Sequence, residues 1–181
     1  SKGGREDPVV HFYEGFLDKY DRENRSRRGV YYTPDSVVNF IVNTVDKILK
    51  KDFKIENGLS NDATWGELVD KKLILKPKVT ENEWNNISTQ QFIKILDPAV
   101  GTGSFINVVS NKIRENLEKN NHNNKIKDVN NLILEKIYGF EIMIAPYSIC
   151  HLKIGLNLKN HNYNFEQNNK RLNVFLNNTL D

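Results

Sequence analysis

The chain has 181 residues, of which 38% are hydrophobic and 27% charged, a balance typical of a globular domain and not of a disordered segment. Its net charge of +3 is only mildly basic, so it permits a polyanionic partner without arguing for one. The single cysteine, Cys150, excludes a disulfide framework and a CxxC metal site, and it favours a reducing compartment, which predicts a cytoplasmic protein. No apolar run approaches the roughly 20 residues of a membrane helix, so no membrane partner is expected.

The N-terminal segment is predicted to form a helix and a basic turn. Apolar residues recur at helical spacing within residues 7–21, and arginines gather in the segment that follows. This turn fits either a contact with DNA phosphates or a solvated basic loop, and both interpretations stay open. The apolar positions are Val9, Phe12, Phe16, Leu17 and Tyr20, and the arginines are Arg22, Arg25, Arg27 and Arg28.

A second helix is predicted to begin near residue 34. Thr33 is a suitable N-cap, Pro34 suits the first helical position, and Asp35 suits the positive end of the helix dipole. One apolar stripe follows at helical spacing, which predicts the face that packs on the core. Its members are Val38, Ile41, Val45, Ile48 and Leu49.

The chain divides into three predicted regions. Residues 1–52 form an N-terminal helical extension. Residues 53–91 are polar, contain both tryptophans (Trp65 and Trp84), and are predicted to be a helical or irregular insertion. Residues 92–181 form the core, in which strand patterns alternate with helix patterns.

This alternation predicts an α/β fold with a parallel sheet and right-handed crossovers. Ligands of such sheets bind at the carboxyl ends of the strands. The predicted strands are residues 92–96, 136–142 and 172–176, and the predicted helices follow the loop at 97–103 or cover 130–137 and 143–159.

The loop "DPAVGTG" at 97–103 connects a predicted strand to a helix, where nucleotide-like ligands bind. It is not a Walker P-loop, because Gly103 is followed by Ser104 and Phe105 instead of Lys and Ser/Thr. It is not a dinucleotide fingerprint either, since the third glycine is replaced by Ile106. Asp97 would repel a pyrophosphate but attract an ammonium group. A nucleoside joined to an amino acid fits this loop, although a plain tight connection is the alternative.

The next predicted strand ends in an acid at the corresponding place. Glu141 could accept hydrogen bonds from both ribose hydroxyls of a nucleoside. Ile142 would then offer an apolar surface to an adenine face. The alternative is a solvated glutamate or a helix N-cap.

Together these motifs resemble the N6-adenine DNA methyltransferases of restriction–modification systems, which use S-adenosylmethionine (SAM). "RRGVYYTP" at 27–34 is similar to the family's first motif, and "DPAVGTGSF" at 97–105 to its SAM loop. "GFEIM" at 139–143 resembles the segment that contacts ribose and adenine. The N-terminal stretch from "DPVVHFYEGF" to "GVYYTP" further resembles large enzymes in which the methyltransferase is fused to a helicase or nuclease. The resemblance implies a Rossmann-like SAM-dependent methyltransferase fold.

The resemblance also implies roles for single residues. The methionine end of SAM would meet Tyr32, Thr33 and Pro34 through its carboxylate and Asp97 through its ammonium group. Ala99, Gly101 and Gly103 would line the pocket, Glu141 would hold the ribose, and Ile142 would stack on adenine. Asn178 would lie near the adenine amino group, where the family often has an acid, and Asp181 is a less suitable substitute.

One feature of the family is absent from the 181 residues. Its catalytic signature, Asn/Asp-Pro-Pro-Tyr/Phe, requires adjacent prolines, and none of the five prolines here neighbours another. In that chemistry the motif holds the target amine and stacks on the flipped base. We therefore expect a SAM-binding fragment of a longer enzyme, without catalytic residues or target-recognition sequence of its own, whose double-stranded DNA is held by other parts.

Two rival functions remain at this stage: a SAM-binding module without catalysis, and a methyltransferase of the same fold that acts on RNA or protein. The histidines and the cysteine give little evidence of function. The histidines lack the spacing of metal ligands, so no metal site is expected. Cys150 lies mid-helix among apolar neighbours and is expected to be buried and unreactive.

Overall fold

The predicted α/β fold is confirmed in the computed structural model, which describes residues 33–119, 129–167 and 170–178. The described strands form a parallel sheet in the order β1-β2-β3. In this sheet Asp97 pairs with Gly139, and Glu141 pairs with Leu176. The strands are β1 (Ile95–Asp97), β2 (Ile137–Glu141) and β3 (Asn173–Leu176).

Helices connect and cover these strands. Helix α6 contacts both α3 and α8, and α8 also contacts β2 and β3. Ile113, Ile137 and Ile154 lie at the centre of the shared core, each at most 1% exposed. The helices are α3 (Asp35–Lys51), α6 (Ser104–Lys119), α7 (Val129–Lys136) and α8 (Ile144–Asn160). The predicted helix at 7–21 and the Arg-rich turn lie outside the described residues.

The predicted cap of α3 is wrong by one residue. Pro34 is the N-cap, and its carbonyl oxygen accepts the N–H groups of Val37 and Val38 at 2.9 and 3.1 Å. Within the described residues no side chain caps this helix, so Thr33 does not serve as its N-cap. The Pro34 carbonyl, and not a side chain, thus accepts the N–H groups of Val37 and Val38 at this helix start.

The predicted stripe on α3 is correct only in part. Val38 is fully buried, but Ile41, Val45 and Ile48 are 41–43% exposed. The buried face instead follows every fourth residue through Val42 to Asp46, because α3 packs there against α6. The exposed positions Ile41 and Val45 line an apolar hollow of about 300 Å³ together with Leu96 and Phe105. This hollow lies beside β1, which pairs only with β2 in the described part of the chain.

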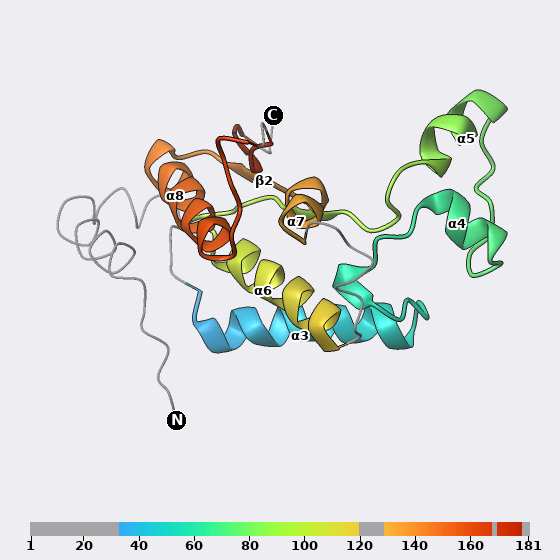
Figure 1. The fold of residues 1–181 in the computed structure, drawn as a ribbon, viewed down its shortest axis with the longest axis horizontal. Helices are drawn as coiled ribbons and strands as arrows, with labels where there is room; N and C mark the ends of the chain where they lie inside the picture. The colour runs from blue at the N-terminus through green and yellow to red at the C-terminus, as the bar shows by residue number, and fades with distance from the viewer. Residues whose placement is uncertain (1–32, 120–128, 168–169, 179–181) are drawn as a thin grey trace.

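The predicted insertion forms a short 3-10 helix, η1 (Gly58–Ser60), and an arm that projects from the core (Figure 1). Both arm helices begin with a capping box, in which Thr64 pairs with Glu67 and Thr80 with Glu83. The arm leaves and rejoins the core at one place, where Thr64 bridges Gln91. Its helices are α4 (Trp65–Asp70) and α5 (Glu81–Ser88).

Lys136 is a fully buried lysine that joins the base of this arm to the sheet. Its ammonium group donates hydrogen bonds to the carbonyl oxygens of Asn61 and, at 3.0 Å, of Ile93. Burial lowers the pKa of Lys136 to about 8, although the nearby Asp62 opposes this shift. The residue thus holds three segments together at a cost in solvation of its charge.

This depressed pKa predicts a stability that rises at alkaline pH. Between about pH 8 and the ordinary lysine pKa of 10.5, the folded chain releases a proton that the unfolded chain keeps. The free energy of unfolding should therefore increase across this window, by at most about 3 kcal/mol from Lys136 alone. Urea unfolding at several pH values measures it. Lys136→Met should lack this contribution, and equal pH slopes in both proteins would contradict the assignment.

Candidate functional site

The candidate site is the loop between β1 and α6, at the carboxyl ends of the strands. Gly101 and Gly103 have φ angles of +55° and +83°, which other residues rarely adopt. A Cβ atom on Gly103 would lie 2.8 Å from the Sγ atom of Cys150. Both glycines therefore allow the turn. In addition, Gly103 lets the loop pack closely against α8.

Glu141 fastens this loop to the end of β2. It is 8% exposed, and its Oε2 atom accepts the N–H of Gly101 at 2.8 Å. Its Oε1 atom accepts the N–H of Met143 at 2.9 Å. One carboxylate thus bridges the segments that follow two neighbouring strands. Sequence reasoning assigned Glu141 to a ligand and missed this bridge.

A third glycine, Gly139, lets the two segments approach. A Cβ atom on Gly139, in the middle of β2, would lie 2.3 Å from a methyl carbon of Val100. The N–H of Val100 then donates to the carbonyl of Phe140 at 2.9 Å, beyond the end of the β1–β2 pairing. Glycine within a strand often marks such a close approach, which is a signal that the sequence contained.

Asp97 is the last residue of β1, and only one of its two carboxylate oxygens accepts a hydrogen bond from the described residues. Its Oδ1 atom accepts the N–H of Ala99 at 3.1 Å. Its Oδ2 atom is buried and has no hydrogen-bond partner within the described part of the chain. Burial raises the pKa of Asp97, the Ala99 hydrogen bond opposes the rise, and the charge of Glu141 adds to it. A donor with a positive charge would satisfy the open oxygen and favour the ionised form.

The remaining candidates on the sheet lie at the same edge. Ile142 follows β2 with 59% of its surface exposed, which leaves its apolar face open. The N–H of Asn177 donates to the carbonyl of Glu141 at 3.0 Å, so the segment with Asn178 lies beside the end of β2. The structure therefore brings Asp97, the glycine loop, Glu141, Ile142 and Asn178 to one edge.

The first motif is only partly described. Thr33 and Pro34 stand at the start of α3, which contacts α6 and begins on the same side of the molecule (Figure 1). Tyr32 and Asp181 lie outside the described residues. The structure thus orients the beginnings of α3 and α6 toward one end, without a described contact between Thr33 or Pro34 and the glycine loop.

Cys150 is buried, as expected, beneath the glycine loop. Burial, with a smaller contribution from the charge of Asp97, raises the pKa of its thiol to about 12, so it is protonated and not a nucleophile at neutral pH. In the described ranges, no three His, Cys, Asp or Glu residues are grouped as metal ligands would be. None of the described helices is both long and apolar enough to cross a membrane.

A comparison with protein families gives the site its context. The model of the family "N-6 DNA Methylase" matches residues 4–57 and 77–181. The chain belongs to this family. The matched ranges include the glycine loop and Glu141. They omit residues 58–76, which contain η1 and α4.

One relative of this chain is much longer than the chain itself. A curated protein of Methanocaldococcus jannaschii, whose name assigns it to the type II restriction enzymes and methyltransferases, is 29% identical over 163 residues. That match covers 84% of this chain and 14% of the relative. The chain therefore spans about one seventh of that relative's length.

Solved structures show the same fold at low sequence identity. The DrdV–DNA complex has a TM-score of 0.56 and 22% identity, and the match covers 93% of this chain and 12% of that chain. A nuclease-deletion mutant of the Type ISP restriction–modification enzyme LlaGI, bound to a DNA substrate mimic, has a TM-score of 0.58 and 20% identity. That match covers 94% of this chain and 11% of the LlaGI chain.

The bridging role of Glu141 predicts a loss of stability when its charge is removed. In Glu141→Gln one amide N–H would face either the Gly101 or the Met143 N–H, so one buried donor loses its acceptor. Urea unfolding should show a loss of about 1–3 kcal/mol. The matched control is Glu135→Gln, which removes an exposed ion pair with Lys170 and should cost less than about 1 kcal/mol. Equal stability of both variants would contradict the bridge.

Proposed function

We propose that this chain is the SAM-binding part of a DNA methyltransferase that transfers a methyl group from SAM to N6 of adenine in a restriction–modification system. The observation that carries the proposal is the buried, unpartnered Oδ2 atom of Asp97 beside the glycine loop of an N-6 DNA methylase. A buried acceptor without a donor is rare in folded proteins, and in this loop a donor group of a bound ligand would satisfy it.

The residues at this edge fit SAM. Asp97 would bind the ammonium group of the methionine moiety, and the remaining lone pairs of Glu141 would accept the ribose hydroxyls. Ile142 would cover one face of the adenine. Asn178 would lie near the adenine amino group. When bound, SAM supplies an electrophilic methyl group on a positively charged sulfur.

The carboxylate end of SAM would meet the beginning of α3. The N–H groups there have no side-chain cap among the described residues, and helix starts attract carboxylates through these groups and the helix dipole. Tyr32, Thr33 and Pro34 would line this end, while Ala99, Gly101 and Gly103 would let the ligand approach the backbone. The charge pattern is complementary: an acid faces the ammonium, and a positive helix end faces the carboxylate.

The same charges disfavour a phosphate ligand. Glu141 lies close enough for its charge to raise the pKa of Asp97. A pyrophosphate in this loop would add at least two negative charges to a pair that already repels. NAD and ATP are therefore poor ligands for the loop on electrostatic grounds.

The remainder of the activity would come from outside these residues. The Asn/Asp-Pro-Pro-Tyr/Phe acceptor motif does not occur in the 181 residues, and the relatives extend far beyond the matched region. We propose that the parent protein supplies this motif, target recognition and contacts to double-stranded DNA, and that it carries a fused helicase or nuclease. A cytoplasmic location suits a protein that acts on chromosomal or incoming DNA.

Ligand binding tests the proposed cofactor. SAM and its demethylated product should raise the melting temperature of the chain more than NAD or ATP does, because they bind only the folded state. Asp97→Asn should weaken SAM binding by about 1.5–3 kcal/mol in calorimetry, the range for a lost charged partner. The control Asp70→Asn changes an exposed acid on α4 and should leave the affinity unchanged. Stronger stabilisation by NAD or ATP than by SAM would refute the proposal.

The proposed division of labour predicts that the isolated chain does not methylate DNA. Binding SAM alone does not position the target amine, and positioning supplies much of the rate of such a reaction. Labelled SAM incubated with the chain and unmethylated DNA should leave adenine unlabelled, whereas an active adenine methyltransferase labels the same DNA. Label in adenine would show that the acceptor site lies within these 181 residues.

A further inference from the structure

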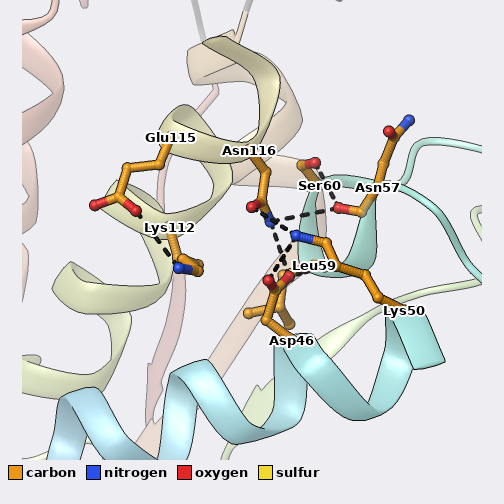
Figure 2. Close-up of polar contacts among 8 residues, drawn as sticks. All are labelled: Asp46, Lys50, Asn57, Leu59, Ser60, Lys112, Glu115 and Asn116. Atoms are coloured by element: carbon orange, nitrogen blue, oxygen red, sulfur yellow. Dashed lines mark hydrogen bonds and ion pairs between the residues drawn. The ribbon is translucent and has the colours of Figure 1, made fainter. Parts of the chain in front are cut away.

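A largely buried polar cluster, which we call the helix clamp, joins α3 to α6 (Figure 2). It consists of Asp46 and Lys50 on α3 and Asn116 on α6. The Oδ1 atom of Asp46 accepts the Asn116 side-chain amide at 2.8 Å, and its Oδ2 atom accepts the Lys50 ammonium at 2.7 Å. Lys50 also donates to the Asn116 Oδ1 atom at 2.8 Å, so the three side chains close a ring of hydrogen bonds.

The clamp also holds the turn before η1. The N–H of Leu59 donates to Asp46 Oδ1 at 3.0 Å, and the Asn116 amide also approaches the carbonyl of Asn57 at 3.4 Å. Gly58 has a φ angle of +51°, and a Cβ atom there would lie 2.1 Å from Asp46 Oδ1. The turn is thus fitted closely to the carboxylate, and one side chain fixes three segments of the chain.

Burying a charged pair is a costly way to hold two helices together, because the charges lose their contact with water. The side chain of Asp46 is 5% exposed and that of Lys50 31%, and removing such a pair from water offsets much of its attraction. Apolar residues such as Val38 and Val42 already join α3 to the core at the same face. Hydrogen bonds of fixed length add what apolar contacts lack: they oppose sliding of one helix along the other.

The position of the clamp relates it to the candidate site. Asp46 lies 11 residues after Asp35, the first residue of α3, and Asn116 lies 12 residues after Ser104, the first residue of α6. In an α-helix these separations correspond to about 16 and about 18 Å along the axis. The two helices run in the same direction with inclined axes (Figure 1). Because the clamp joins the two helices at similar distances from their first residues, it fixes the beginning of α3 relative to the beginning of α6.

We infer that Asp46 and Asn116 are positioning residues for the cofactor: the clamp sets the axial position of α3 on α6, and thereby places the beginning of α3 against the SAM carboxylate. The inference rests on the proposed function, because it requires SAM at the glycine loop that precedes α6. On this inference, the clamp affects the binding of the methionine end of SAM only. The nucleoside end is held by β2 and by residues that the clamp does not touch.

Two ligands separate this role from a general loss of stability. SAM carries the amino-acid group, and 5′-methylthioadenosine has the same nucleoside and sulfur without it. Asp46→Asn and Asn116→Leu should each raise the Kd for SAM about fivefold or more, the usual lower range of coupling between sites. The Kd for 5′-methylthioadenosine should change less than about twofold. Calorimetry on the full chain, well below the melting temperature of each variant, measures both constants.

Matched variants complete the experiment. Ile133→Val loosens the buried core on α7, which carries none of the site residues, and Lys112→Met removes a surface ion pair beside the clamp (Figure 2). Both should leave the two Kd values unchanged. The double variant Asp46→Asn/Asn116→Leu should have a Kd for SAM no higher than that of the more affected single variant, because the two residues act through one contact. Lys50→Met, which removes the more exposed partner, gives the same comparison if either single variant unfolds.

The outcomes separate this inference from the proposed function. If the clamp variants weaken SAM and 5′-methylthioadenosine in the same proportion, or weaken neither, the clamp only stabilises the fold and the inference is overturned. If the unmutated chain binds 5′-methylthioadenosine but not SAM, the assignment of the methionine end is wrong. If it binds neither ligand, the proposed function fails, and this inference fails with it.

Discussion

The glycine loop keeps its shape because one buried carboxylate, that of Glu141, accepts backbone N–H groups from the ends of two neighbouring strands. The shape of the whole edge depends on this bridge. Gly139 removes the side chain that would keep the loop away from β2, and the Glu141 carbonyl in turn accepts the N–H of Asn177 after β3. The ends of β1, β2 and β3 are thus connected through one residue and its own backbone.

This bridge has an electrostatic consequence for Asp97. Two hydrogen bonds hold the Glu141 carboxylate near Asp97. Asp97 must therefore carry its charge in a partly buried position, close to another negative charge. Such an arrangement disfavours the charged form of Asp97, and a positive charge beside it would favour that form. It also explains why a loop that resembles a phosphate-binding turn in its glycines differs from one in its chemistry.

Much of the fold could be predicted because each core element has a periodicity of its own. The alternation of strand and helix patterns after residue 92 sufficed for the parallel sheet, and the acids at two strand ends sufficed for the location of the candidate site. The Thr-x-x-Glu pairs at Thr64 and Thr80 were equally local signals of helix starts, although the sequence interpretation left this region undefined.

The rest depended on contacts between distant residues. The apolar stripe on α3 did not reveal that Asp46 would be buried, since the reason is Asn116, 70 residues away. The dual use of Glu141 was hidden for the same reason, because its partner Gly101 is 40 residues earlier. Thr33 failed as an N-cap although its residue type is suitable, because the chain enters α3 one residue later. Sequence patterns specify which residue types suit an element, and tertiary contacts decide which of them are used.

The narrow base of the arm has a practical consequence. The chain enters the arm at Thr64 and leaves it at Gln91, and these residues are bridge partners, so the two ends are adjacent whatever lies between them. A segment attached in this way can be shortened, replaced or extended without a change in the distance that the core must span. The tip between α4 and α5, where Leu75 is 92% exposed, is therefore a suitable place to insert a fluorescent reporter or an affinity tag.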